Sequence, residues 1–245
     1  KAMTELFVYT NEKRDLEYIV PESVEKINSY AFSENQYLKN IILPDSLKEI
    51  GQSCFYQCKL LRSVEIPKDV TVIAPSTFYG CEQLERVAIP DGVTIIDRSA
   101  FAMCTELQNV ILPDALVSIG QYAFYNCHQA FEKLTIPSNV TSIGDSAFNE
   151  CYTISDISLP NSLREIGETA FRACYCLNRI AIPDSVTTIG YNAFLGCGNI
   201  DKLVASMSSD IPIIALDTKA VTLICSEGSS AFEYAQKYDI PVEFH

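Results

Sequence analysis

The chain has 245 residues and a formal net charge of −13, from 18 basic and 31 acidic side chains. This excess of carboxylates argues against binding to nucleic acids or anionic membrane surfaces, which are recognised through cationic patches. No apolar run approaches the length that a membrane-spanning helix needs, so we expect a chain that does not span a bilayer.

The first 19 residues differ in pattern from the rest of the chain and are expected to cap the fold. Residues 6–10 have the character of a short strand, and residues 11–15 that of a charged turn. The end units of a repeat protein must cover a core that would otherwise be exposed, so an atypical segment is expected there.

From residue 20 to about residue 200 the sequence repeats with a period of 23 residues. Eight prolines, eight isoleucines and eight phenylalanines recur at this interval, with a single interval of 24. A fixed period of this length indicates a solenoid, in which each unit buries its apolar side against its neighbours. The phenylalanines are Phe32, Phe55, Phe78, Phe101, Phe124, Phe148, Phe171 and Phe194.

Each unit follows the pattern L-x-x-I-x-I-P-x-x-V-x-x-I-G-x-x-A-F-x-x-C-x-x, which predicts one strand and one tight corner. Apolar residues alternate over 177–182, which is strand spacing, and Pro183 ends the pairing because it has no N–H to donate. The glycine after the isoleucine, as in Gly51 and Gly120, predicts a left-handed corner. Ala74 interrupts this column, so either that corner differs or the column is set by space.

The A-F-x-x-C segment is too short for a full helix and predicts a single turn of 3₁₀ type. The longer interval lies at residues 127–131, where Phe131 takes the place of the leucine. We interpret the added residue as a loop bulge without further consequence.

After Ile200 the pattern fades, and the end of the chain is expected to cap the last turn. Strands are expected at 221–225 and 240–244. Ser230 with Glu233 is a capping-box signature, which predicts a short helix through Tyr238. The domain prediction is one domain with a cap at 1–19, about eight repeats at 20–200, and a degenerate turn and cap at 201–245.

The repeat pattern over residues 20–199 resembles the BspA-like (treponemal-type) leucine-rich-repeat family, and residues 222–244 look like its closing segment. The match is specific, because eight columns agree over eight turns. The resemblance implies a right-handed solenoid with parallel strands on the concave face. It also implies surface or secreted proteins of host-associated anaerobic bacteria, some of them adhesins, with no catalytic motif.

Ten cysteines occur, and seven are in register with the repeat. Stacked equivalent side chains point the same way, whereas a disulfide needs converging Cβ vectors. We therefore expect a ladder of buried free thiols, with Cys54 buried beside it. Cys176 and Cys225 lie off the ladder and are the candidates for reaction. The ladder is Cys58, Cys81, Cys104, Cys127, Cys151, Cys174 and Cys197.

Catalysis is not expected. The two histidines, His128 and His245, have no recognisable nucleophile motif, and no phosphate-binding loop occurs. Neither Cys54 with Cys58 nor any other pair has the second ligand pair of a zinc site, so we expect no metal and no cofactor.

The outward positions of the strands are the candidate partner-binding surface. They combine a mildly basic row with a row of small or apolar residues, and apolar surface beside fixed charge can mark a protein interface. The alternative is that these residues only keep the sheet soluble. The candidate residues are Asn40, Ser63, Arg86, Asn109, Lys133, Asp156, Arg179 and Lys202 in the first row, and Ile42, Glu65 and Ile111 in the second.

Tyrosines around the A-F-x-x-C turns could anchor a partner, or they could cover the edge of the core. They are Tyr56, Tyr79, Tyr125, Tyr152 and Tyr175.

Three functions are compatible with these observations. The leading hypothesis is a monomeric, non-catalytic recognition module that binds a protein or glycoprotein along the strands. It would be extracellular or on the cell surface, with the signal peptide already removed, since the chain starts at Lys1. The alternatives are a spacer within a larger surface protein and an intracellular interaction scaffold, which free thiols permit.

Overall fold

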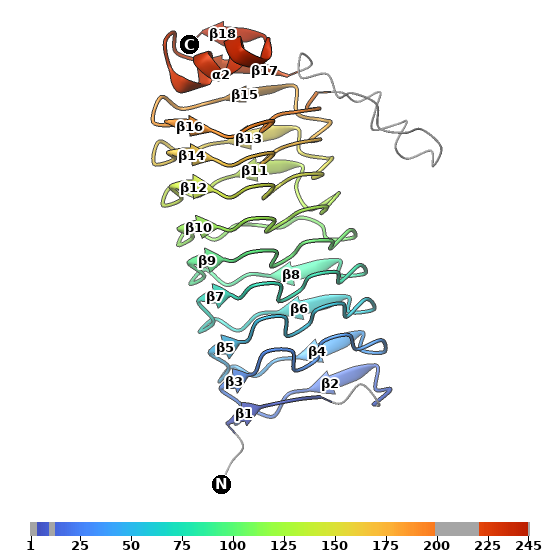
Figure 1. Ribbon diagram of the computed structural model, residues 1–245. Coiled ribbons are helices and arrows are strands. Elements are labelled where there is room, and N and C mark those ends of the chain that lie inside the picture. The colour runs from blue at the N-terminus through green and yellow to red at the C-terminus, as the bar shows by residue number, and fades with distance from the viewer. Residues whose placement is uncertain (1–3, 10–12, 199–220, 245) are drawn as a thin grey trace, which may run out of the picture.

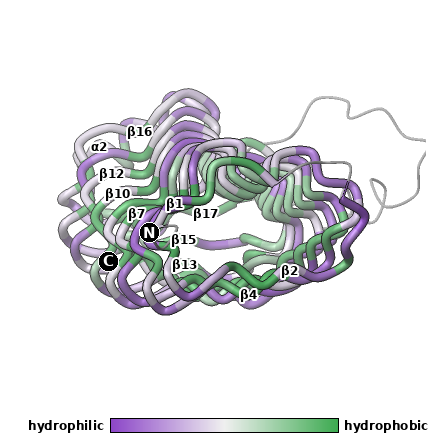
Figure 2. The backbone as a smooth tube through the Cα atoms, turned by 90° about the horizontal axis from the view of Figure 1, so that it is seen from below, coloured by the Kyte–Doolittle hydropathy of each residue, from purple (hydrophilic) through white to green (hydrophobic). Residues whose placement is uncertain are grey.

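The computed structural model describes residues 4–9, 13–198 and 221–244, which form a stack of coils (Figure 1). Strands β1 (Glu5–Leu6) and β18 (Val242–Phe244) lie at opposite ends of this stack. Seen nearly along the stack, successive coils superimpose around a shared interior (Figure 2). The expected repeat solenoid with parallel strands and little helix is confirmed.

The predicted strand of each unit forms one side of the stack. In the strands of the repeats the middle residue points into the core and its two neighbours point outward, as period-two alternation requires. The outward side of these strands is called the strand face below. Every pairing along it is parallel. The strands are β2 (Glu17–Ile19), β4 (Asn40–Ile42), β6 (Ser63–Glu65), β8 (Arg86–Ala88), β11 (Lys133–Thr135), β13 (Asp156–Ser158), β15 (Arg179–Ala181) and, at the end, β17 (Thr222–Cys225) and β18.

A second parallel ladder, which the sequence pattern did not predict, runs along another side of the stack (Figure 1). Except for β1, its two-residue strands end on the repeated isoleucine, which is buried in all but β16, as in β5, β7 and β14, where the preceding residue faces outward. Two residues are too few to show an alternation, so the pattern gave no strand signal. This ladder, called the second sheet below, is hydrogen-bonded in two parts, which do not pair between β5 and β7. The first part is β1, β3 (Lys26–Ile27) and β5 (Glu49–Ile50), and the second is β7 (Val72–Ile73), β9 (Ile95–Ile96), β10 (Ser118–Ile119), β12 (Ser142–Ile143), β14 (Glu165–Ile166) and β16 (Thr188–Ile189).

The prediction of a left-handed corner at the repeated glycine is wrong. Gly144 does not have a positive φ; instead, a Cβ there would lie 2.5 Å from the backbone nitrogen of Gln121 in the preceding coil. The column is therefore set by space between coils. Positive φ values occur two residues before and two residues after each phenylalanine, as at Ser53 (52°) and Gln57 (57°).

The segment around each phenylalanine, here called the phenylalanine corner, alternates two kinds of hydrogen bond. The Cys58 N–H donates to the Phe55 carbonyl at 3.1 Å within the coil, the spacing expected of a 3₁₀ turn. The Phe55 N–H donates to Thr77 O of the next coil at 2.8 Å. With left-handed residues on both sides, the segment is a series of tight turns that joins each coil to the next.

The phenylalanine rings form a continuous stack through the core. All eight are fully buried, and consecutive ring centroids lie 5.2 to 5.7 Å apart. Offset stacking of this kind adds to the free energy gained from burying the rings. One hydrophobic cluster extends from Leu6 to Ile240.

The two ends differ in detail from the prediction. Strand β1 covers only Glu5–Leu6 of the expected 6–10, of which Thr10 lies outside the described residues; the Tyr9 N–H donates to Ala31 O of the next coil at 2.7 Å. At the other end, β17 pairs with β15 and β18. The closing strand begins at Val242, two residues later than expected.

The predicted C-terminal helix is confirmed as α2 (Ser230–Tyr238), but its N-cap is Ser229 and not Ser230. The Ser229 Oγ accepts a hydrogen bond from the Phe232 N–H at 3.2 Å, as N-cap side chains do. The helix buries Ala231, Tyr234 and Ala235 against the last coil. Ser230 instead donates from Oγ to Val186 O, which fastens the cap to the repeats.

Candidate functional site

The strand face presents the predicted partner-binding residues to solvent. From Asn40 in β4 to Arg179 in β15, each candidate is exposed. Lys202 lies outside the described residues, and in the register of the sheet the position beside Arg179 belongs to Thr222. The structure therefore gathers the remaining ten candidates on one side of the stack, although it does not test their role.

Charge on the strand face is less uniformly basic than the row suggests. Arg179 forms an ion pair with Glu243 of β18, so its charge is offset within the cap. Arg86 and Lys133 have no carboxylate oxygen within 4.0 Å among the described residues. Of the described cations in this row, Arg86 and Lys133 are therefore the two that can form an ion pair with a carboxylate of a partner.

The strand face is interrupted at residues 109–111, here called the break. Strand β8 ends one sheet and β11 begins the next, with no strand between them in the described chain. Pairing is also missing between β13 and β15, but there both coils keep their strand. Asn109 adopts a left-handed φ of 53°, and the Val110 N–H donates to Ala130 O at 3.0 Å. Ala130 belongs to the segment with the extra residue, so the expected loop bulge is hydrogen-bonded directly to the coil of the break.

The break exposes Ile111 and opens a hollow beside it. Ile111 is 82% exposed, the largest value among the exposed large hydrophobic residues described, compared with 49% for Ile42 in the same row. A hollow of about 290 Å³ lies between this coil and the next. Its lining includes Ile111, Leu112, Asp114, Phe131, Lys133 and Pro137. Apart from Ile111 and Lys133 these residues were not predicted; the 24-residue interval was the available signal.

His128 and Phe131 show how the extra residue is accommodated. The His128 ring stacks on Tyr152 at 4.3 Å, and burial lowers its pKa below the ordinary value for histidine. Phe131 enters the core and contacts Phe124 and Phe148 edge-on, with centroids 5.1 and 5.6 Å away. Both aromatic side chains serve packing. His245 lies outside the described residues.

The seven predicted thiols form a buried ladder, with each sulfur donating to a phenylalanine carbonyl of the preceding coil, for example Cys127 Sγ to Phe101 O at 3.0 Å. Burial raises the pKa of Cys58 and of Cys127 to about 12. All ten cysteines are free, and Cys54 is buried as expected. Cys225 is buried too, which leaves Cys176 as the partly exposed thiol.

The tyrosines near the phenylalanine corner cover the core edge. Tyr56 stacks on Tyr79 at 5.0 Å, and Tyr152 on Tyr175 at 5.0 Å. Tyr175 is buried and the others are half-buried, so their ring faces are occupied by one another. Burial, with a contribution from Glu150, raises the pKa of Tyr152.

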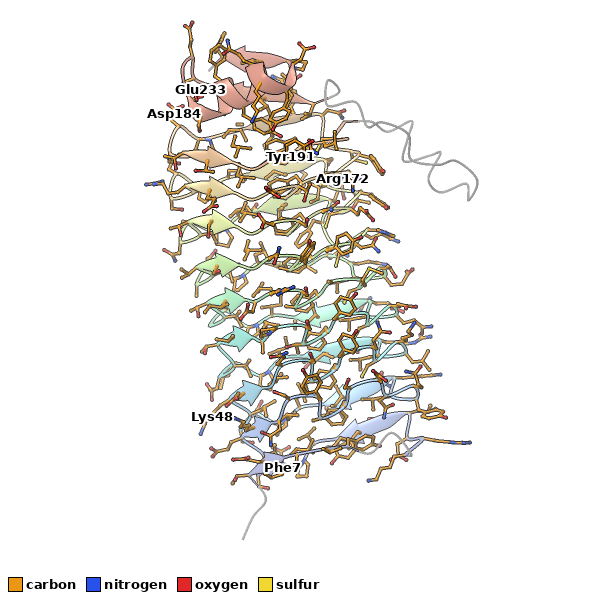
Figure 3. The ribbon with its side chains drawn as sticks, in the orientation of Figure 1. Phe7, Lys48, Arg172, Asp184, Tyr191 and Glu233 are labelled. Carbon is orange, nitrogen blue, oxygen red and sulfur yellow. The ribbon has the colours of Figure 1, made fainter. Side chains whose placement is uncertain are left out.

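Metal-binding clusters and membrane-spanning helices do not occur in the described part of the chain. Within it, no three His, Cys, Asp or Glu side chains are grouped closely enough to hold a metal ion. None of its helices has the length and hydrophobicity to cross a bilayer. Side chains on other sides of the stack, such as Lys48 beside the second sheet, point into solvent (Figure 3).

Comparison with known protein families identifies one family of repeat proteins. The family described as BspA type leucine rich repeat region matches residues 5–129 and 72–201, with six copies of its repeat. No curated protein matches the chain.

Solved structures of bacterial repeat proteins are similar to this chain. A leucine rich repeat protein of T. pallidum matches with a TM-score of 0.65 and 25% identity, over 71% of this chain and 82% of that one. A leucine rich cell surface protein of Faecalibacterium prausnitzii matches with a TM-score of 0.54 and 31% identity, over 76% of this chain and 46% of that one. A leucine-rich repeat protein of Bacteroides ovatus, at 22% identity and a TM-score of 0.60, shows the fold alone; 98% of this chain and 62% of that one are covered.

Proposed function

Because the chain belongs to the BspA-type leucine-rich-repeat family, we propose that it is a non-catalytic recognition module that binds a protein or glycoprotein along the strand face. The proposal places it on the cell surface or outside the cell, in line with the description of the F. prausnitzii protein as a cell surface protein. That protein is about twice as long as its matched part, so its likeness to this chain concerns the repeat region alone.

The observation that carries the proposal is that most first-row side chains of the strand face have no hydrogen bond or ion pair within the described chain. From Asn40 to Asp156 the first row makes no side-chain hydrogen bond and no ion pair within the described chain. A partner can therefore bind these groups without first breaking internal bonds, and only the water around them must be displaced. A rigid sheet also holds them in fixed positions, which lowers the entropy lost on binding.

By contrast, several side chains in the second sheet and directly before its strands already have partners within the protein. Lys26 pairs with Glu49 at 2.8 Å, and Lys48 with Glu25 at 3.1 Å. The Thr94 hydroxyl donates to Thr71 O at 3.3 Å. Side chains that are already satisfied gain less from a partner, so the strand face is the better candidate.

Binding of the purified chain to immobilised extracellular matrix proteins, mucin and cells, at about 50 and 300 mM salt, tests the proposal. The variant R86E/K133E is expected to lose about tenfold or more in affinity, because both cations are unpaired and exposed. Arg179 is left unchanged, since its reversal would break the ion pair with Glu243.

The control variant K68E/R98E makes the same charge change away from the strand face, at two exposed residues. It removes the exposed Lys68–Asp69 pair, whose charged atoms are 3.7 Å apart and which contributes little to stability. It is expected to bind as the unmodified chain does. If the folded chain shows no saturable binding to any of these surfaces, the recognition proposal fails and the spacer hypothesis takes its place.

A further inference from the structure

We propose that the break at residues 109–111 is the anchor point of the strand face. There the partner inserts an apolar side chain into the hollow beside Ile111 and places a carboxylate on each side, against Arg86 and Lys133. The inference rests on the proposed function and names the chemistry of its partner: a protein segment with an apolar residue between acidic ones.

The first argument is that several irregularities coincide at this place on the strand face. The 24-residue interval, the left-handed Asn109, the interrupted sheet and the hollow all involve the coil of residues 109–114 and the next one. The regular strands of the strand face present rows of exposed side chains on either side of a buried one. The hollow adds depth to this face, and binding energy concentrates where a side chain is fully desolvated in a pocket.

The second argument concerns the exposure of Ile111. The fold buries little of the Ile111 side chain, which is 82% exposed, so burial of this side chain contributes little to folding stability. The equivalent residue one coil earlier, Ala88, has a much smaller apolar side chain. Together with Leu112, Phe131 and Pro137, which line the hollow, Ile111 gives an apolar wall that a partner's side chain can cover. Covering it removes apolar surface of both partners from water.

The third argument is the arrangement of charge around the hollow. Arg86 lies one coil before Asn109 and Lys133 one coil after it, so the two cations are roughly 10 Å apart along the stack. Neither has an internal ion-pair partner among the described residues. Asp114 lines the hollow itself, so a carboxylate inserted there would be repelled. The charges thus favour an apolar group inside the hollow and acidic groups outside it.

The test is a selection of random dodecapeptides displayed on phage against the immobilised chain. The expected result is enrichment of peptides with an aliphatic or aromatic residue between Asp or Glu residues. Fluorescence anisotropy with synthetic copies would then show at least tenfold weaker binding to I111S and to R86E/K133E. Charge neutralisation of the acidic residues in the peptide should weaken binding similarly.

Two matched variants control for general effects. I95S removes a similar aliphatic side chain from the second sheet, where Ile95 is 36% exposed, and K68E/R98E repeats the charge change elsewhere. Both should bind the peptides like the unmodified chain, and urea unfolding should show that I111S is as stable as I95S or more so.

Enrichment of peptides without this pattern, or equal binding to I111S and I95S, would overturn the inference. Such a result leaves the proposed function standing if the protein panel still binds through Arg86 and Lys133. Selected peptides that match a segment of this chain would instead identify a second copy as the occupant and would equally overturn an external partner.

Discussion

The phenylalanine corner and the strand face respond differently to the same extra residue. Across it, the ring stack continues from Phe101 through Phe124 to Phe148, with centroid distances of 5.3 and 5.5 Å and interplanar angles of 8° and 7°. The thiol ladder also continues, with Cys151 Sγ 3.2 Å from Phe124 O. The strand face, in contrast, loses a strand at residues 109–111.

This difference between the corner and the strand face shows which part of a coil fixes its position relative to the next coil. At the phenylalanine corner, buried rings and hydrogen bonds in both directions hold each coil against the next. On the strand face only the middle residue of each strand is buried, so a coil can leave the ladder without opening the core. Variation is therefore tolerated on the strand face, and this is the surface to which we assign recognition.

The largest effect should follow from removing a ring of the stack. Phe101→Ala should lower the free energy of unfolding by about 3–5 kcal/mol, because it leaves a cavity between two buried rings. Ile111→Ala, in the next part of the same coil, should change it by less than about 0.5 kcal/mol, because that side chain is exposed. Urea unfolding followed by circular dichroism measures both, and equal losses would mean that the corner does not dominate stability.

A smaller effect is expected from adding a methyl group between coils. Gly144→Ala would place a Cβ 2.5 Å from Gln121 N and should cost about 1–3 kcal/mol. Gly92→Ala is the matched control, since its Cβ would lie 3.5 Å from the nearest atom, Lys68 O. Thermal unfolding of the two variants should differ clearly; similar midpoints would contradict a column set by space.

The smallest change in stability, but the most direct test of the break, should come from deleting Gln129. The deletion restores the 23-residue interval, so residues 109–111 should rejoin β8 and β11 as a strand. Hydrogen exchange of amides in 109–111 and 133–135 should then slow by roughly tenfold or more. Gln129→Ala keeps the chain length and should leave exchange unchanged. Unaltered exchange after the deletion would show that the extra residue does not cause the break.

The sequence predicted the architecture well because the repeat supplies the same information eight times. The burial of the phenylalanines, the thiol ladder and the exposure of the strand-face residues all follow from the register of one unit. The end helix was found from its cap residues, with an error of one position, because two serines stand side by side at 229 and 230.

What the sequence did not reveal depends on contacts between coils. Gly144 is needed because of the backbone of the coil before it, and a single unit contains no sign of that approach. The left-handed positions near each phenylalanine hold residues as different as Ser53, Met103 and Glu150, so composition does not mark them. At the break, Ala130 accepts a hydrogen bond from Val110 of the previous coil, whose own sequence is regular.

The hydrogen bonds that join the coils also determine how the molecule would respond to force. Bonds such as Phe55 N–H to Thr77 O run from coil to coil along the stack, and each coil contacts only its neighbours. Tension between the two ends therefore loads these connections in series, and the coils separate one at a time. Separation should begin at residues 109–111, where a strand is missing from the ladder, so the molecule would lengthen from its middle while both capped ends stay folded.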